Sequence, residues 1–303
     1  MERRIPVFPK DSRVCFLGDS ITAGGLWVEA IFEYYLKKFP GGNVRIYNTG
    51  TGGGTINFAM NYLEEDILLL NPTHVIIMYC ANDMNRYEGT YLQRASMFLE
   101  EIRRITNYFR ERGIIVYYGI EPKCQTEDQS TFTARDAGWA AMKSAAEEYN
   151  TGYFDLYTMM SPYIFENAGL VGEDLVHFTN LGESVMAKLF LYSQGFEEFS
   201  PDNENFLSEI KLSQAGLRRR EINNKIRRIW MAEANVLLAV IGAPVEKKIE
   251  RLKERIPTRA NGQWDDFCYD RAMDYIQFRP YLEEYRAQLE AVTDEMTVQW
   301  DNC

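Results

Sequence analysis

Residues 14–20, Val-Cys-Phe-Leu-Gly-Asp-Ser, decide the fold, because an apolar run stops abruptly there at a turn. The run from Val14 to Leu17 is typical of a buried strand, and apolar residues at helical spacing begin near Leu26. We therefore predict a strand, a tight turn and a helix. A serine in such a turn lies where a buried strand has just ended, so its hydroxyl can face a cleft. Ser20 is a candidate nucleophile, although Gly-Asp-Ser alone is a common turn tripeptide.

The alternation of strand and helix continues along the chain. The residues after His74 are continuously apolar as far as Cys80, which is typical of a strand buried on both faces of a parallel sheet. The pattern predicts an α/β fold, a three-layer flavodoxin-like sandwich with a central five-stranded parallel sheet. The expected strands are 14–17, 44–47, 74–80, 114–119 and 152–156, and the expected helices are 26–39, 56–69, 90–112, 133–149 and 181–192. In such sheets ligands bind beyond the carboxyl ends of the strands.

The composition changes at residues 200–203, Ser-Pro-Asp-Asn, after which few strand signals remain. We predict a catalytic domain over residues 1–199 and a helical extension over residues 200–303, with helices at 212–241, 246–256 and 275–296. Apolar residues spaced alternately four and three apart predict a packed helical seam in the last of these, at Phe278, Leu282, Tyr285, Leu289, Val292 and Met296. The extension could be a lid, a docking layer or a dimerisation element that makes the chain a homo-oligomer.

A basic cluster lies within the first helix of this extension. Three arginines, Arg218 to Arg220, are followed by Lys225, Arg227 and Arg228. Because Ile222, Ile226, Ile229 and Trp230 form an apolar stripe, we expect the basic residues to lie on the opposite, solvated face.

The composition indicates which binding partners and which cellular compartment to expect. A formal net charge of −11 argues against nucleic acid, because phosphate binding depends on accumulated Lys and Arg. No run approaches the roughly 20 apolar residues that span a membrane, and the first residues contain no apolar segment of a signal peptide. The five cysteines are scattered and lack metal-ligand spacing. We therefore expect a cytoplasmic protein without a bound metal.

A serine nucleophile needs a base, and the chain has only two histidines. His74 begins a predicted strand, at the edge of the sheet opposite the strand ends, and is therefore a poor candidate. Asp174 and His177 lie three residues apart, a spacing that lets both side chains share one face of a loop or helical turn. Asp174 can then orient the imidazole while its other nitrogen faces Ser20, as in a catalytic triad.

Attack on an ester carbonyl also needs donors for the developing oxyanion, each worth about 3 kcal/mol. The glycine-rich turn at residues 50–55 can supply the N–H of Gly53, Asn82 can supply its amide, and the N–H of Ser20 is a third candidate. The run of glycines at 52–54 leaves the backbone donor open by one residue. The turn fits neither the dinucleotide-binding pattern nor the P-loop, which argues against a nucleotide site. Asp19 and Asp83 are expected to form turns and brace loops.

These four segments together resemble the SGNH or GDSL hydrolase family of serine esterases and lipases over about residues 12–195. Residues 18–22 resemble its first block, 48–53 its second, 81–83 its third and 174–177 its last. The resemblance implies Ser20 as nucleophile, Asp174 and His177 as the rest of the triad, and Gly53 and Asn82 as oxyanion donors. Two departures are Cys80, where the family more often has glycine, and Phe178, where it commonly has proline. Cys80 in the glycine position could narrow or reshape the pocket wall, but its place in a strand favours a small core residue.

The resulting hypothesis is a serine esterase that works through an acyl-enzyme and needs no cofactor. The family resemblance implies an acetyl or other short acyl ester as substrate, on a carbohydrate or another small molecule. Two alternatives stay open: an acyltransferase with the same triad, which an added alcohol acceptor would reveal, and a non-catalytic binding or scaffold protein, which a fluorophosphonate probe would fail to label at Ser20.

Overall fold

The computed structural model describes residues 4–123, 129–164, 166, 169–240, 247, 250 and 266–301. The chain divides by its contacts into two compact units, Met1–Leu217 with Met296–Cys303, and Arg218–Glu295. Residues 200–217 thus group with the unit that contains the sheet. The division into functional domains at residue 200 stays a prediction.

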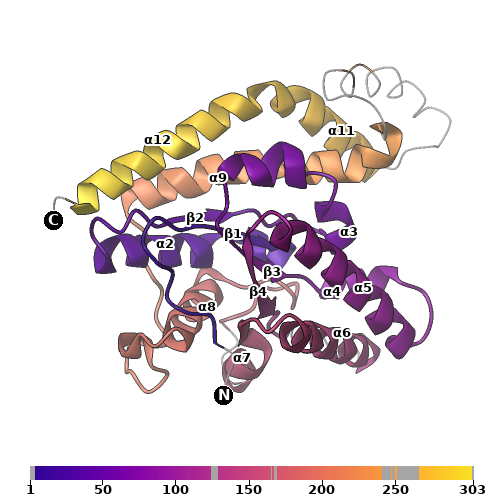
Figure 1. Cartoon of the computed structure of the whole chain (residues 1–303), viewed down its shortest axis with the longest axis horizontal. Coiled ribbons are helices and arrows are strands. Elements are labelled where there is room, and N and C mark those ends of the chain that lie inside the picture. The colour runs from indigo at the N-terminus through magenta and orange to yellow at the C-terminus, as the bar shows by residue number, and fades with distance from the viewer. Residues whose placement is uncertain are drawn as a thin grey trace. The chain divides into compact units, whose positions relative to one another are not determined.

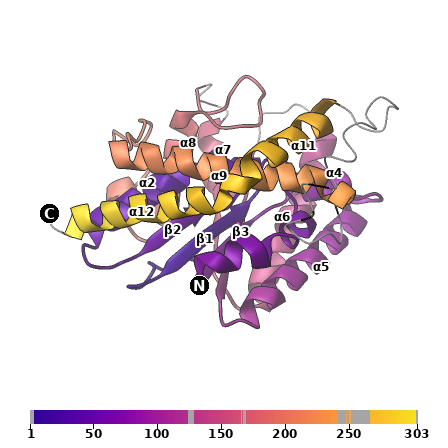
Figure 2. The same cartoon turned by 90° about the horizontal axis from the view of Figure 1, so that it is seen from above.

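The first unit contains the predicted parallel sheet. Its strands are β1 (Arg13–Gly18), β2 (Arg45–Asn48), β3 (His74–Met78), β4 (Ile115–Ile120) and β5 (Tyr153–Asp155), and they lie in the order β2-β1-β3-β4-β5. All four neighbouring pairs are parallel, and Figure 2 shows β2, β1 and β3 side by side. Every residue of β3 is buried, as its continuous apolar sequence predicts. Gly18 pairs with Met78 and Ile120 with Asp155, so the strands end together at one edge.

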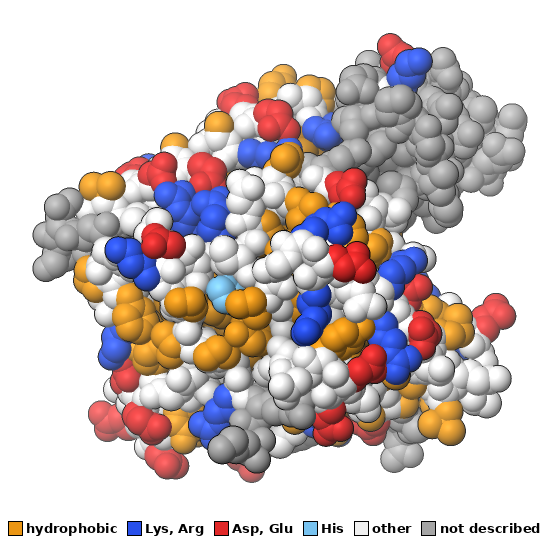
Figure 3. Space-filling model, viewed as in Figure 1, with side chains coloured by type: hydrophobic (Ala, Val, Ile, Leu, Met, Phe, Trp, Pro, Cys, Tyr) orange, Lys and Arg blue, Asp and Glu red, His pale blue; other side chains and the backbone are white. Residues whose placement is uncertain are grey.

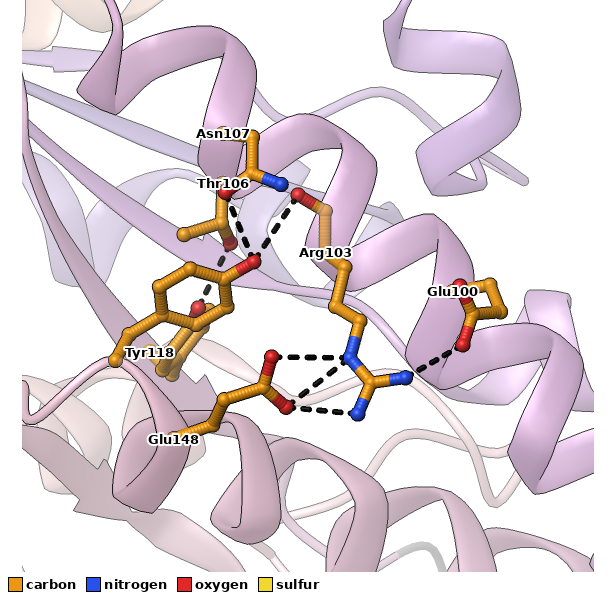
Figure 4. Close-up of polar contacts among 7 residues, drawn as sticks. Glu100, Arg103, Thr106, Asn107, Tyr118 and Glu148 are labelled. Carbon is orange, nitrogen blue, oxygen red and sulfur yellow. Dashed lines mark hydrogen bonds and ion pairs between the residues drawn. The ribbon is translucent and has the colours of Figure 1, made fainter.

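Helices cover the sheet and give the three-layer α/β fold that the sequence predicts. On one side α2 (Leu26–Lys38) packs against α8 (Asn180–Ser193), and on the other α5 (Tyr91–Arg110) packs against α6 (Gln129–Glu148) (Figure 1). Polar contacts join α5 to α6: Arg103 Nη2 lies 2.8 Å from Glu148 Oε2 (Figure 4). In the same view the hydroxyl of Thr106 lies 2.7 Å from that of Tyr118 and so links α5 to β4.

The helix predicted over residues 56–69 is wrong as a single element. It is divided into α3 (Ile56–Ala59), the π-helical turn η1 (Leu63–Ile67) and the 3-10 turn η2 (Leu68–Leu70). The Asn61 amide donates to the carbonyls of Asn57 and Phe58, which offers the backbone an alternative to the regular helical ladder. The sequence also missed α4 (Ala81–Arg86) and α7 (Leu156–Ile164), because each begins within a few residues of a strand end, without a loop to mark it.

The second unit is helical, as predicted. It is built from parts of α9 (Gln214–Val240) and α12 (Leu282–Asp301) together with α11 (Asp266–Phe278). The single helix expected over 275–296 is interrupted by the 3-10 turn η5 (Arg279–Tyr281), where Pro280 has no N–H to continue the ladder. Leu282, Leu289 and Val292 of the predicted seam are buried. Of the helix predicted over 246–256, only residues 247 and 250 are described, and both are helical.

The basic cluster of α9 differs from the expected solvated face. Arg219 is fully buried and its Nε donates to Thr293 Oγ1 at 2.9 Å, and Arg227 is also buried. The hydroxyl of Thr293 gives Arg219 a partner that the sequence pattern of α9 does not reveal. Arg228, in contrast, is exposed and lies 3.1 Å from Asp274 Oδ2.

None of the described helices is long and apolar enough to span a membrane. On the face shown in Figure 3, acidic and basic side chains are intermixed, and neither sign forms a continuous surface there.

Candidate active site

Ser20 lies at the end of β1, as the sequence predicts. It is the first residue of the short helix α1 (Ser20–Ala23), and its side chain is partly exposed. The Asp19 carboxylate caps this helix, because Asp19 Oδ1 accepts the N–H of Ile21 at 2.9 Å. Gly18 allows the close turn: a Cβ at this position would lie 2.5 Å from the Met78 carbonyl oxygen. The sequence Gly-Asp-Ser therefore holds the hydroxyl at the carboxyl edge of the sheet.

Asp174 and His177 form a hydrogen-bonded pair in the loop before α8. His177 Nδ1 lies 2.5 Å from Asp174 Oδ2, and both side chains are about half exposed. Asp174 Oδ1 also accepts the N–H groups of Val176 and His177, at 3.0 and 2.9 Å. Hydrogen bonds from the imidazole first, and from these N–H groups next, lower the pKa of Asp174 to about 2. The carboxylate therefore stays ionised beside His177 at neutral pH.

Backbone strain accompanies this pair. Leu175 has φ of 59°, in the left-handed region that non-glycine residues rarely adopt. The loop is held on both sides of Leu175, because Gly172 donates its N–H to the His177 carbonyl at 2.7 Å and Leu175 donates to Gly172 at 3.0 Å. Strain of this kind persists only where surrounding contacts impose it, and it is frequent at active sites.

Ser20 and the imidazole share one region but are not hydrogen-bonded. His177 lies close enough to Asp19, the residue before Ser20, to lower the pKa of that carboxyl. Among the described residues, Ser20 Oγ has no hydrogen-bond partner. Catalytic hydrogen bonds are often long without substrate and tighten in the substrate complex.

The glycine-rich turn after β2 is attached to the Ser20 turn. Thr51 donates its N–H to the Gly18 carbonyl at 2.9 Å, and the Asn48 amide donates to the Thr22 carbonyl at 2.8 Å. Gly54 uses its N–H on the Thr51 carbonyl. Gly53 has φ of 69°, and a Cβ there would meet no atom within 4 Å. In the described part of the chain the N–H groups of Gly53 and Ser20 find no acceptor, so both are open to a ligand.

Asn82 lies on the short helix α4, at the same edge of the sheet as Ser20. Its amide nitrogen donates to Asp19 Oδ2 at 3.0 Å and to the Gly54 carbonyl at 3.2 Å. An amide nitrogen carries two hydrogens, so both are engaged in this structure. To donate to an oxyanion, Asn82 must release one of them, and the longer bond, to Gly54, is the weaker.

Three buried carboxyl groups, those of Asp19, Asp83 and Glu121, lie in this part of the structure. Asp83 accepts the N–H of Ile56 at 3.0 Å and so braces the chain after the glycine turn, and burial raises its pKa to about 8. Asp19 is tied to Asn82, as described. The third, Glu121, directly follows β4, and its Oε2 accepts the N–H of Ala81 at 3.0 Å. The sequence predicted that Asp19 and Asp83 brace loops, but it did not predict a role for Glu121. The only indication of such a role in the sequence is the position of Glu121 at the end of a strand.

Two residues singled out from the sequence are buried side chains that line no open pocket wall. Cys80 does not narrow a pocket wall: its side chain is fully buried against α6, and a Cβ on Gly138 would lie 2.4 Å from its Sγ. His74 is buried at the opposite edge of the sheet, where its Nδ1 lies 2.7 Å from Thr73 Oγ1 and burial lowers its pKa. Among the residues with described positions, no group of three or more His, Cys, Asp or Glu side chains is arranged to hold a metal ion.

Residues 16–185 match the GDSL-like Lipase/Acylhydrolase family. The chain belongs to this family. A GDSL-like acylhydrolase cleaves ester bonds, so the protein is an ester-bond hydrolase that acts on a small-molecule ester.

Relatives and solved structures agree with the GDSL-like assignment. The acetylxylan esterase of Geobacillus stearothermophilus is 24% identical over 208 residues, which cover 61% of this chain and 94% of that protein. Among solved structures, a lipase/acylhydrolase from Enterococcus faecalis has a TM-score of 0.52 at 20% identity and covers 61% of this chain and 96% of its own. BT4096, a gut microbial diltiazem-metabolizing enzyme, has a TM-score of 0.69 at 16% identity and covers 99% of this chain and 97% of its own. The fold of this GDSL-like chain, C-terminal helices included, thus occurs in another enzyme.

Proposed function

We propose that the protein is a serine esterase in which Ser20 is the nucleophile, His177 the base and Asp174 the residue that orients His177. One observation carries this proposal: the 2.5 Å contact between His177 Nδ1 and Asp174 Oδ2 in a loop near the Ser20 turn. An imidazole whose Nδ1–H is held by a carboxylate presents its other nitrogen as a proton acceptor. The Ser20 hydroxyl, which has no other described partner, is the acid that this base would deprotonate.

In the proposed reaction Ser20 Oγ attacks the ester carbonyl while His177 takes its proton. The tetrahedral intermediate collapses when His177 returns that proton to the departing alcohol, which leaves Ser20 acylated. Water then repeats the sequence and releases the acid. The N–H groups of Ser20 and Gly53, which are open to a ligand, and the Asn82 amide would stabilise the negative oxygen in both steps.

We propose a short acyl ester, acetyl in the first instance, as the substrate. The similarity to an acetylxylan esterase supports an acetylated carbohydrate, and the structural similarity to a diltiazem-metabolizing enzyme adds diltiazem as a probe. The test is turnover of p-nitrophenyl acetate, acetylated xylooligosaccharides and diltiazem by the wild type and by Ser20→Ala. Loss of at least about 10³-fold in Ser20→Ala is expected, and equal rates would refute the mechanism.

A matched control separates chemistry from folding. Ser193→Ala removes a hydroxyl that donates to the Phe190 carbonyl at 2.6 Å, at the end of α8. This variant should keep wild-type turnover. A fluorophosphonate probe should label the wild type and Ser193→Ala but not Ser20→Ala. An unlabelled wild type would refute Ser20 as the nucleophile, and acyl transfer to an added alcohol in preference to water would favour the transferase.

A further inference from the structure

The Asp19–Glu121 pair is the feature of the site that the proposed chemistry leaves unexplained. Both carboxyl groups are 2% exposed, and they lie close enough together for each to shift the pKa of the other. Asp19 comes from the turn after β1 and Glu121 from the end of β4. Two carboxylates have only acceptor oxygens, so a hydrogen bond between them requires one shared proton.

The surrounding donors assign that proton to Glu121. Asp19 Oδ1 accepts the N–H of Ile21, and Asp19 Oδ2 accepts the amide of Asn82. Glu121 Oε2 accepts the N–H of Ala81, whereas Glu121 Oε1 has no donor among the described residues. With the proton on Oε1, Glu121 donates to Asp19, and every one of these four oxygens has a partner. With the proton on Asp19, Glu121 would be the ionised group, and its Oε1 would accept only the hydrogen bond from Asp19. The neutral carboxyl group of Asp19 would also be a weaker acceptor for the Asn82 amide than a carboxylate is.

The charges that face the pair favour this state. Burial is the largest effect and raises the pKa of both groups, and the negative charge of Asp19 raises that of Glu121 further. Arg135 on α6 opposes the shift for both carboxyls, and His177 opposes it for Asp19. Asp83 on α4 and Cys80 after β3 lie in the same buried region. One negative charge on the pair, facing Arg135, costs less than two.

We propose that Glu121 is a positioning residue of the esterase site: its protonated carboxyl holds the Asp19 carboxylate and the Ala81 N–H, and thereby fixes the Ser20 turn and the Asn82 amide relative to each other. The inference rests on the proposed function of Ser20 and Asn82. Glu121 thereby connects the ends of β1, β3 and β4. Asp19 accepts from the Ile21 N–H and from the Asn82 amide. In the proposed state Glu121 donates to Asp19 and accepts from the Ala81 N–H.

Two substitutions separate the proton from the bulk of the side chain. Glu121→Gln supplies a permanent N–H donor to Asp19 and keeps an oxygen for Ala81, so kcat should stay within about threefold of wild type. Glu121→Leu removes both, and a misplaced oxyanion donor should lower kcat by about 10- to 100-fold with KM within about threefold. Glu33→Leu is the matched control. It removes another buried glutamate, on α2, whose carboxylate accepts a hydrogen bond from the Ser213 hydroxyl at 2.7 Å. This variant should leave kcat unchanged.

The pH profile tests the proton itself. When alkaline conditions remove it, the pair becomes two facing carboxylates, so the kcat of the wild type should fall. Glu121→Gln has no such proton and should lack this alkaline loss. An alkaline loss of equal size in both proteins, or a Glu121→Leu variant with wild-type kcat, would overturn the proposal.

A structural readout keeps this test independent of the proposed function. The Asn82 side-chain NH₂ signals, assigned by their absence in Asn82→Ala, should keep their chemical shifts in Glu121→Gln and move in Glu121→Leu. If Ser20→Ala turned over esters as fast as wild type, the mechanism would fail while these shifts still decided whether Glu121 positions Asn82. Unchanged shifts in Glu121→Leu would refute the positioning role whatever the activity.

Discussion

Replacing Asp83 by asparagine should remove a pH-dependent loss of stability. The Asp83 side chain is 1% exposed, and Oδ1 accepts the N–H of Ile56. Asparagine keeps an oxygen for this bond. Asp83 Oδ2 has no hydrogen-bond partner among the described residues, so placing the asparagine NH₂ group at that position breaks no hydrogen bond. The substitution therefore changes the charge that Asp83 can acquire more than it changes the contacts.

The magnitude follows from the shift of the pKa. Burial raises it from 3.8 to about 8, so the folded protein binds this proton more tightly than the unfolded chain does. The stabilising contribution is complete below about pH 4 and is lost as the pH rises to about 8. At about 1.4 kcal/mol for each pH unit, the loss between about pH 5 and pH 8 is about 4 kcal/mol.

Urea unfolding at a series of pH values, followed by tryptophan fluorescence, measures this effect as the difference between wild type and Asp83→Asn. Other groups titrate in both proteins and cancel in the difference. Asp83→Leu is the control: it also lacks the charge but leaves the Ile56 N–H without its acceptor, so it should be less stable than Asp83→Asn by a pH-independent amount of about 1 kcal/mol or more. A difference between wild type and Asp83→Asn that does not change between about pH 5 and pH 8 would refute the reasoning.

Two further predictions concern the reacting groups. Asp174→Asn keeps an oxygen for the N–H groups of Val176 and His177 but loses the charge that orients the imidazole. The kcat for p-nitrophenyl acetate should therefore fall by about 10³- to 10⁴-fold, while the melting temperature changes little. A loss of kcat below tenfold would contradict the triad. Gly53→Ala and Gly113→Ala both place a methyl group in open space at positive φ, 69° and 74°; each should cost about 1 kcal/mol of stability, and only Gly53→Ala should lower kcat, by tenfold or more. Because alanine keeps the backbone N–H, equal kinetics in these two variants would show that strain at residue 53 does not displace the oxyanion donors.

Local patterns predicted well where the candidate reacting groups lie in the fold. A strand that stops at Gly-Asp-Ser places Ser20 at the sheet edge, because the parallel strand ends there whatever the rest of the chain does. Only two residues separate Asp174 from His177, and a loop of that length brings the side chains together without help from distant segments. Strand ends and short loops are determined by neighbouring residues, so a single sequence reveals them.

Boundaries that depend on competing hydrogen bonds were predicted poorly. Where the helix at residues 56–70 is divided, the Asn61 amide competes for the carbonyls of Asn57 and Phe58, and periodicity does not report such competition. The burial of Arg219 depends on Thr293, which is 74 residues away in the chain. Amphipathic spacing along α9 alone could not identify that partner.

The sequence by itself predicted Ser20, Asn82 and the Asp174–His177 pair as the site of a GDSL-like hydrolase, and it predicted that Ser20 and Asn82 follow strands whose ends meet. Only the tertiary structure decided that Asp19 and Glu121 are buried near each other and that the Asn82 amide is already engaged by Asp19 and Gly54. The physical reason is burial: a carboxyl group at a strand end is an ordinary polar residue until other strands and helices exclude water from it. Desolvation then favours one retained proton on the pair, and the surrounding hydrogen-bond donors favour Glu121 as its site.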